Sequence, residues 1–285
     1  MPLELEISAF DPSIFEKKRL NGRAPVILFI GSRGTGKSSA VIDTLSYFNR
    51  DIPFVVMSGT EASNGAYSNH VHEACIYPNF NKDVVEAIIE NQNRIGAEYK
   101  KKGEDFKKHP EHGVGILLDD LSYDKSIMKQ QCLRELALNG RHLNCILILT
   151  FQYAMDIPCV FRENADFIFI ASQNKKDSID KLYKYFCSYF DKVSDFKKVL
   201  NKCTENYGQL VVDNTSTSKR IEDCVYWFRA NINKSFKICP KQWPMWDNQL
   251  KKDEVENSKT FQRPLGESDI IVKIKPTHSR RMDFE

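Results

Sequence analysis

Short apolar segments alternate along the chain with longer segments in which apolar residues recur every three or four positions. The apolar runs occupy residues 26–30, 53–58, 115–118, 145–150 and 166–172. Such runs, bounded by turn signals, indicate strands that are buried on both faces. Segments with helical spacing lie between them, at residues 38–48, 125–138 and 177–189. Strands that alternate with helices predict an α/β doubly wound fold, with a mainly parallel central sheet flanked by helices.

Three further segments carry weaker patterns. Residues 59–80 are rich in Ser, Asn, Gly and Tyr, and we interpret them as a long functional loop. Residues 83–108 predict a helix whose second half is densely charged. Residues 207–213 and 223–229 predict a terminal pair of strands.

The two ends of the chain differ from the middle. Residues 3–7 alternate between apolar and polar positions and predict a short entry strand, whereas the pattern fades after residue 240 except for a strand-like piece at 270–274. We therefore expect an N-terminal extension at residues 1–20, one folded domain at 21–250 and a polar C-terminal tail at 251–285.

Residues 31–39 read GSRGTGKSS and follow the first apolar run directly. They fit G-x-x-x-x-G-K-[ST], the phosphate-binding loop or P-loop, in its expected place between a strand and a helix. Glycines let successive backbone N–H groups point at phosphate oxygens, Lys37 can reach the β- and γ-phosphates, and the Ser38 hydroxyl can bind Mg²⁺. The helix that follows presents its positive end to the anion. The predicted nucleotide-binding residues are Gly31, Ser32, Arg33, Gly34, Thr35, Gly36, Lys37, Ser38 and Ser39.

Two carboxylates and an amide at the ends of later strands predict hydrolysis. Asp119 and Asp120 follow an apolar run, and Gln152 follows the next one. If the Asp119 strand is a neighbour of the P-loop strand, Asp119 lies beside the loop and binds Mg²⁺ through its water shell, as the partner of Ser38. Asp120 would then polarise the attacking water. Gln152 can contact the γ-phosphate and the water, or it simply caps its strand.

Composition restricts the class of protein. The chain has 285 residues, of which 41% are hydrophobic and 28% charged, and its net charge of +3 is too small to indicate nucleic-acid binding by itself. No segment approaches the roughly 20 apolar residues of a membrane span, and the N-terminus lacks the form of a signal peptide. The eight cysteines include no C-x-x-C pair, which indicates free thiols in a reducing compartment. We expect a soluble, intracellular protein.

Residues 174–177, NKKD, open an alternative interpretation. N-K-x-D after a strand is the guanine-reading element of GTPases, because its Asp accepts hydrogen bonds from the base. A GTPase switch also needs D-x-x-G, whose Gly N–H senses the γ-phosphate, but residues 119–122 read DDLS.

A P-loop kinase for a small molecule is the third possibility. It would need a lid of arginines over the nucleotide, and a strand-end Gln after a double-acid strand argues against it.

Several motifs together carry a family resemblance. In chain order, GSRGTGKSS, GILLDDL and NGRHLNCILILTFQ resemble the genome-packaging ATPases of nucleocytoplasmic large DNA viruses, of the poxvirus type. These enzymes belong to the FtsK–HerA superfamily of P-loop motors. FRENADF at 161–167 resembles the R-x-N-x-D-[YF] segment of the family, and VYWFRAN at 225–231 resembles its late strand. The resemblance covers roughly residues 20–240 and implies a RecA/FtsK-like P-loop ATPase domain.

The resemblance implies a mechanism and partners. ATP and Mg²⁺ would bind between the subunits of a homo-oligomeric ring, expected to be a hexamer, which moves double-stranded DNA into a preformed capsid. By position, Asp120 is the catalytic base and Gln152 the strand-end sensor, while Arg141 or Arg162 acts on the neighbouring subunit's γ-phosphate. Alternatively, each arginine is a surface residue paired with an acid. The other expected partners are a capsid vertex or portal and a nuclease or resolvase, and the expected location is the virus factory in the host cytoplasm and the virion.

Overall fold

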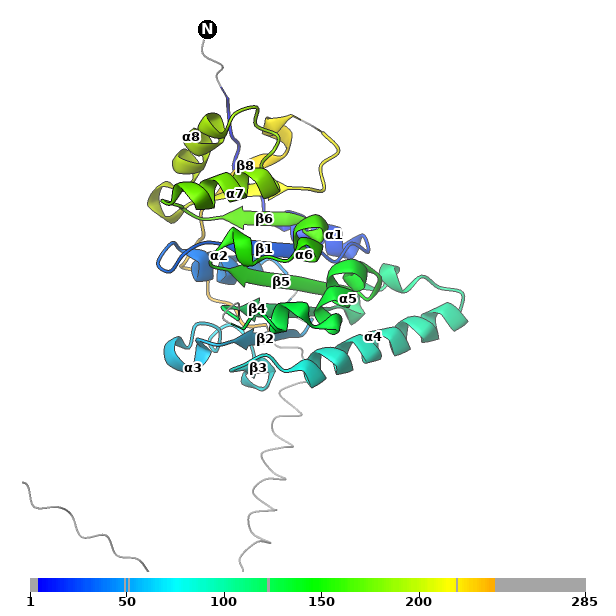
Figure 1. Cartoon of the computed structure of the whole chain (residues 1–285). Helices are drawn as coiled ribbons and strands as arrows, with labels where there is room; N and C mark the ends of the chain where they lie inside the picture. The colour runs from blue at the N-terminus through cyan, green and yellow to red at the C-terminus, as the bar shows by residue number, and fades with distance from the viewer. Residues whose placement is uncertain (1–4, 49, 51, 122–123, 219, 239–285) are drawn as a thin grey trace, which may run out of the picture. The chain divides into compact units, whose positions relative to one another are not determined.

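A computed structural model describes residues 5–238, apart from residues 49, 51, 122–123 and 219. Its centre is an eight-stranded sheet with the strand order β3-β2-β4-β5-β1-β6-β7-β8 (Figure 1). The strands are β1 Val26–Ile30, β2 Phe54–Ser58, β3 Ile76–Tyr77, β4 Val114–Asp119, β5 Cys145–Phe151, β6 Phe167–Ile170, β7 Gln209–Asp213 and β8 Val225–Phe228. All neighbouring strands from β3 to β6 pair in parallel, whereas β7 pairs antiparallel with both β6 and β8. The predicted mainly parallel α/β fold is confirmed, as is the terminal strand pair.

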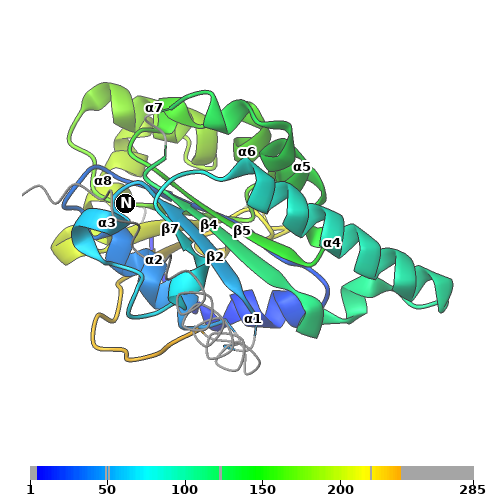
Figure 2. The same ribbon diagram turned by 90° about the horizontal axis from the view of Figure 1, so that it is seen from below.

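Helices cover both faces of the sheet. They are α1 Ser13–Leu20, α2 Lys37–Leu45, α3 Glu61–Asn64, α4 Lys82–Lys101, α5 Gln131–Asn139, α6 Cys159–Asn164, α7 Lys176–Phe186 and α8 Val193–Cys203. Figure 2 shows α1 and α2 on one face and α4, α5, α6 and α7 on the other. None of the helices in the described part of the chain has both the length and the apolar character that a bilayer crossing requires.

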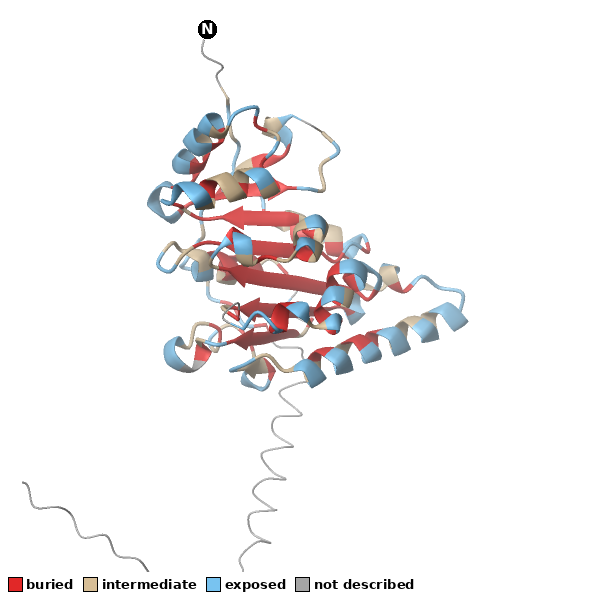
Figure 3. Ribbon diagram, in the orientation of Figure 1, coloured by how far each residue is buried: buried red, intermediate tan, exposed pale blue. Residues whose placement is uncertain are grey.

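Burial on both faces explains the apolar runs. All five residues of β1 are buried, and the strands form the continuous buried layer in Figure 3. Side chains alternate between the faces of a strand. Leu28 therefore belongs to the core under α5, whereas the Phe29 ring faces the other layer and stacks on Phe169 at 4.5 Å between ring centroids. On that second face Phe15 of α1 contacts the Phe167 ring at 5.1 Å.

The sheet order does not meet the condition set for Asp119, that its strand is a neighbour of the P-loop strand. The Asp119 strand, β4, is not a neighbour of β1, because β5 lies between them and pairs with both. The ends of the three strands still meet at one edge, since all three are parallel. This order places Gln152, the residue after β5, between the P-loop and the two carboxylates.

The predicted helix at 83–108 is shorter in the structure. α4 ends at Lys101, and the chain reverses through Gly103, whose φ of 77° lies in the left-handed region. The return segment carries two short 3₁₀ turns, Phe106–Lys108 and Pro110–His112, before β4 begins.

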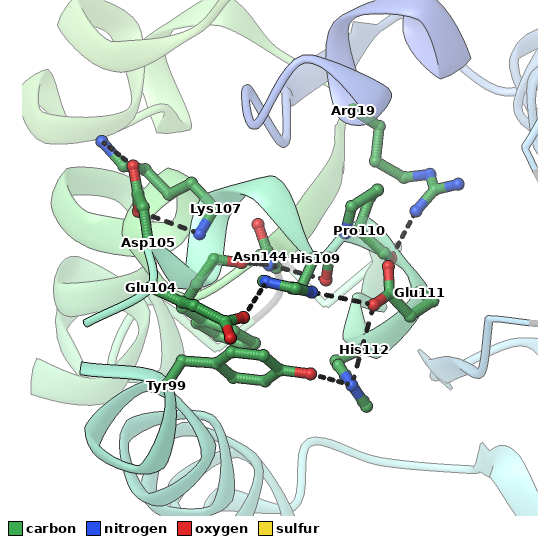
Figure 4. A network of polar contacts seen from close by, with 11 residues as sticks. Arg19, Tyr99, Glu104, Asp105, Lys107, His109, Pro110, Glu111, His112 and Asn144 are labelled. Atoms are coloured by element: carbon green, nitrogen blue, oxygen red, sulfur yellow. Dashed lines mark hydrogen bonds and ion pairs between the residues drawn. The ribbon is translucent and has the colours of Figure 1, made fainter. Parts of the chain in front are cut away.

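A polar network fixes this return segment to the end of α4 (Figure 4). The Tyr99 ring stacks on His109 at 4.0 Å between centroids, and its hydroxyl lies 2.9 Å from Nε2 of His112. Nε2 of His109 lies 2.9 Å from the Glu104 carboxylate, and Nδ1 lies 3.1 Å from that of Glu111. Two of the acidic side chains in the densely charged segment, Glu104 and Glu111, are therefore used inside the network.

The segment before β1 packs against the sheet. Phe10 is buried, and its N–H donates to the Trp227 carbonyl at 2.8 Å. Of the entry strand predicted at 3–7, residues 3 and 4 lie outside the described residues. Residues 5–7 form no strand, and pairing occurs instead at a single bridge between Ala9 and Trp227. The tail at 251–285, with its strand-like piece at 270–274, also lies outside the described residues.

Candidate nucleotide-binding site

The P-loop at 31–39 connects β1 to α2. Gly34 and Gly36 have φ angles of 75° and 83°, a left-handed conformation that glycine adopts without strain. The Thr35 hydroxyl donates to the Ser32 carbonyl at 2.7 Å and closes the loop on itself. Because α2 begins at Lys37, the unpaired N–H groups of its first turn open toward the loop.

Close packing fixes the start of the loop. The Gly31 N–H donates to the carbonyl of Phe151, the last residue of β5, at 3.0 Å. A Cβ on Gly31 would lie 2.7 Å from both the Thr35 hydroxyl and the Ala171 Cβ, so no side chain fits there. The loop is thereby held in register with the end of β5.

A cavity of about 320 Å³ lies over the loop. Its lining residues are Ser32, Arg33, Gly34, Gly36, Lys37, Ser38, Ser39, Thr60, Asn64, Asp119, Asp120 and Gln152. The predicted nucleotide-binding residues thus line the cavity, except Gly31 and Thr35, which brace the loop. Burial lowers the pKa of Lys37, although the nearby Asp119 and Asp120 carboxylates oppose that shift. A partly buried ammonium beside this opening favours a polyanionic ligand.

One hydroxyl contacts both acidic residues, one through its carboxylate and the other through its backbone. Thr150, the residue of β5 beside the acids, is buried and donates from Oγ1 to Oδ1 of Asp119 at 2.7 Å. The same oxygen accepts the backbone N–H of Asp120 at 3.0 Å. The Gln152 amide then donates to Oδ1 of Asp120 at 2.7 Å. Asp120 has a φ of 52°, a left-handed conformation that Asp tolerates better than most residues, at the abrupt end of β4.

The oxygen donors in the cavity fit a magnesium ion. Ser38 and Asp119 line the same cavity and offer a hydroxyl and a carboxylate, the hard oxygen ligands that Mg²⁺ prefers. Oδ1 of Asp119 is engaged by Thr150, while Oδ2 has a long contact of 3.5 Å with the Ser58 hydroxyl. These contacts orient the Asp119 carboxylate at the edge of the cavity. A bound Mg²⁺ would neutralise charge on the β- and γ-phosphates.

The two candidate arginines lie away from this cavity. Arg141 precedes β5 in a 3₁₀ turn, Gly140–His142, and so lies at the opposite end of that strand from Gln152, about 20 Å away at the usual rise of a strand. Arg162 lies on α6, and its guanidinium carbon is 3.9 Å from the centroid of the Tyr185 ring. The structure does not bring either arginine to the nucleotide cavity of its own chain.

Sequence reasoning missed several residues of the site. Thr150 ends an apolar run, and nothing in that run indicates which neighbour its hydroxyl meets. Thr60 and Asn64 come from the loop that the polar composition of 59–80 singled out as functional. The Glu61 carboxylate holds this loop by accepting the backbone N–H groups of Tyr67 and Ser68, at 3.0 and 2.9 Å.

The guanine-reading alternative gains no support from the cavity. Among the described residues that line it, none comes from 174–177. Asn174 and Asp177 are exposed, and Asp177 lies in the first turn of α7, where an acidic side chain is favoured by the helix dipole.

A P-loop between a buried parallel strand and a helix, with oriented carboxylates and a strand-end glutamine at the same sheet edge, defines a P-loop NTPase. The family described as poxvirus A32 protein matches residues 13–231. The chain therefore belongs to the poxvirus A32 protein family, and the resemblance to the packaging ATPases of large DNA viruses is confirmed at the family level.

One relative and two solved structures extend this comparison. Uncharacterized protein L437 of Acanthamoeba polyphaga mimivirus is 32% identical over 211 residues, which are 74% of this chain and 74% of that protein. The pCW3 conjugation coupling protein TcpA, solved as a monomer with ATPγS, has a TM-score of 0.56 at 12% identity, over 88% of this chain and 75% of TcpA. The genome packaging NTPase B204 of Sulfolobus turreted icosahedral virus 2 has a TM-score of 0.49 at 15% identity, over 73% of this chain and 98% of B204. The TcpA match agrees with the predicted P-loop fold.

Proposed function

We propose that this protein is an ATP-driven motor that packages double-stranded viral DNA into a capsid. The observation that carries the hydrolytic part is the hydrogen-bonded set Asp119, Thr150, Asp120 and Gln152, which adjoins the P-loop. Membership of the poxvirus A32 family and the order of motifs along the chain support the packaging part.

In the proposed reaction, the loop N–H groups and Lys37 bind the triphosphate, with its γ-phosphate toward Asp120. Asp120 accepts a proton from the attacking water as the water oxygen bonds to the γ-phosphorus. The bond from that phosphorus to the β,γ-bridging oxygen breaks, which leaves ADP and inorganic phosphate. Gln152 already holds Asp120 at 2.7 Å. If the γ-phosphate or the attacking water accepts a hydrogen bond from the Gln152 amide, it competes with the Asp120 carboxylate for that donor. Nucleotide binding would then be coupled to the conformation at the end of β5.

We assign the trans-acting role to Arg141 rather than Arg162. Arg141 is exposed and lines a polar cavity of about 410 Å³ together with the basic residues Lys18 and Arg23 and the acidic residues Glu163 and Asp166. Arg162 is stacked on Tyr185, and its Nε is buried without a hydrogen-bond partner among the described residues. For Arg162 to act on the γ-phosphate of a neighbouring subunit, its stack on Tyr185 would have to break. Arg141 is already accessible to a neighbour.

The two cavities support a ring. The nucleotide cavity lies at the carboxyl edge of the parallel strands, and the Arg141 cavity lies at their amino edge. Two different surfaces on opposite sides of one subunit suit a head-to-tail contact, and head-to-tail contacts close into rings when the rotation permits. The hexameric state, a capsid vertex or portal, a nuclease or resolvase, and location in the host cytoplasm and virion stay predictions from the family resemblance.

The direct test measures ATP hydrolysis with and without long double-stranded DNA. We expect DNA to stimulate turnover, and the stimulation to fall steeply with salt because the contacts go to phosphates. Lys37→Ala, which removes the phosphate-binding ammonium, is the control that should abolish turnover under both conditions. Turnover that is indifferent to DNA, in a protein that stays monomeric at every concentration with ATP, would argue against the motor.

A further inference from the structure

We propose that Tyr207 is the platform on which the nucleotide base stacks. The base would then lie on the β7 side of the P-loop, away from the catalytic carboxylates. This inference rests on the proposed nucleotide site and adds to it a residue that binds the base.

Tyr207 is an exposed aromatic residue placed directly against the P-loop. Its relative exposure is 71%, compared with 41% for Tyr153 and 39% for Trp227. A Cβ built on Gly36 would lie 3.1 Å from the Tyr207 Cβ and 3.7 Å from its Cδ1. The ring therefore begins at the loop that binds the phosphates, and most of its surface is open to a ligand.

The backbone at Tyr207 is unusual. Asn206 and Tyr207 have φ angles of 52° and 61°, so two consecutive residues other than glycine adopt the left-handed conformation. This conformation is disfavoured for L-residues, and for a bulky aromatic residue it is a clear outlier. Strain of this kind persists only where the surrounding structure enforces it, and it is frequent at ligand sites.

The surrounding contacts do enforce this conformation. A Cβ on Gly208 would lie 2.2 Å from the Cys203 carbonyl oxygen, so the turn requires glycine there. The Glu205 carbonyl accepts the Gly208 N–H at 3.0 Å and an Arg229 guanidinium N–H at 3.2 Å. Tyr207 is thus presented on a turn fixed before any ligand binds, which lowers the cost of ordering on binding.

A second contact ties this turn to the phosphate loop. The side-chain amide of Gln209, the first residue of β7, donates to the Gly36 carbonyl at 3.4 Å. Since β7 runs antiparallel to β6, its first residue lies at the same sheet edge as the P-loop. This bond connects the turn that carries Tyr207 to the P-loop.

The strand order sets the direction of the nucleotide. β1 lies between β5 and β6, with the hydrolytic residues on the β5 side and Tyr207 on the β7 side. A γ-phosphate that faces Asp120 and Gln152 leaves the other end of the nucleotide to extend toward Tyr207. Every base offers a π-face, so stacking supplies affinity and little discrimination between adenine and guanine.

The test compares two ligands, ATP and inorganic tripolyphosphate, by calorimetric titration. Tyr207→Ala should weaken ATP binding about tenfold, in line with base–aromatic stacking, and leave tripolyphosphate binding unchanged, because that ligand has no base. Tyr207→Phe is the matched control, since it keeps the ring and should keep wild-type affinity for both ligands.

The outcomes separate the two proposals. If the Tyr207→Ala variant binds ATP as tightly as the wild type, or loses affinity for both ligands equally, Tyr207 does not stack on the base. The proposed phosphate site of the wild-type protein is not affected by that result. If the wild-type protein binds neither ATP nor tripolyphosphate, the proposed function itself fails.

Discussion

At the scale of single residues, the site depends on one hydroxyl that contacts both acidic residues, Asp119 through its carboxylate and Asp120 through its backbone N–H. Thr150 donates to the Asp119 carboxylate and accepts the Asp120 N–H, and it is nearly inaccessible at 2% relative exposure. A group that positions both acids is therefore neither charged nor part of a recognised motif.

Thr150→Val keeps the shape of this side chain and removes both hydrogen bonds. We expect ATP turnover to fall about 10- to 100-fold, as for other residues that orient metal ligands, and stability to fall by about 1–3 kcal/mol because buried polar groups lose their partner. Thr150→Ser is the control and should retain most of the turnover. Equal turnover in the valine variant and the wild type would show that Thr150 does not position the acids.

The lowered pKa of Lys37 predicts a pH dependence of ATP binding. Burial lowers this pKa from the ordinary value of 10.5, so the ammonium loses its proton at a lower pH than an exposed lysine does. The triphosphate binds the protonated form, so affinity should be constant below the lowered pKa and should fall as pH rises through it.

Calorimetry can measure this linkage from about pH 7 to about pH 10, the range in which an ordinary lysine is still protonated. Binding in the upper part of this range should take up protons, so the observed enthalpy should vary with the ionisation enthalpy of the buffer. Affinity that stays flat throughout, without proton uptake, would mean that Lys37 titrates like an exposed lysine.

At the scale of elements, the contact between β2 and β4 holds the strand that carries the carboxylates. A Cβ on Gly115 of β4 would lie 2.2 Å from Cε1 of Phe54 on β2, and Phe54 is fully buried. Gly115→Ala should therefore destabilise the protein by about 1–3 kcal/mol through overpacking, measured by denaturant unfolding.

Two further variants sharpen this prediction. Adding Phe54→Leu to Gly115→Ala should recover part of the loss, because the smaller side chain makes room. Gly96→Ala on α4 is the matched control: its Cβ would meet Phe106 at 3.4 Å, an ordinary contact, and alanine favours the helix. A Gly115→Ala protein as stable as the wild type would disprove the close packing of β2 on β4.

The strands could be predicted from the sequence because a strand buried on both faces is a continuous apolar run, which can be recognised within a single segment. The order of the strands could not be, since it depends on pairing between distant segments. The position of β5 between β1 and β4 places Gln152 beside the acids, where its amide donates to Asp120 and it lines the same cavity as the P-loop. Likewise, nothing in the sequence NYG indicates that Tyr207 adopts a left-handed conformation against Gly36, because that conformation is imposed by contacts from Cys203 and Glu205.

At the scale of the whole molecule, the assignment of Arg141 makes a prediction about mixtures. Arg141→Ala protein added to wild-type protein should reduce DNA-stimulated turnover more than in proportion to its fraction, because each variant subunit disables its neighbour's site. Arg162→Ala, which removes the stack on Tyr185, is the comparison and should reduce turnover only in proportion. A linear loss with Arg141→Ala would place that side chain outside the neighbour's site.

The proposed motor uses ATP hydrolysis at the P-loop to move along double-stranded DNA. It is tested most directly by displacement of a third strand bound to a linear duplex. We expect ATP-dependent displacement by the wild-type protein, and none by Asp120→Asn, which should still bind ATP and DNA. ATP hydrolysis without displacement, or displacement that persists in Asp120→Asn, would contradict it.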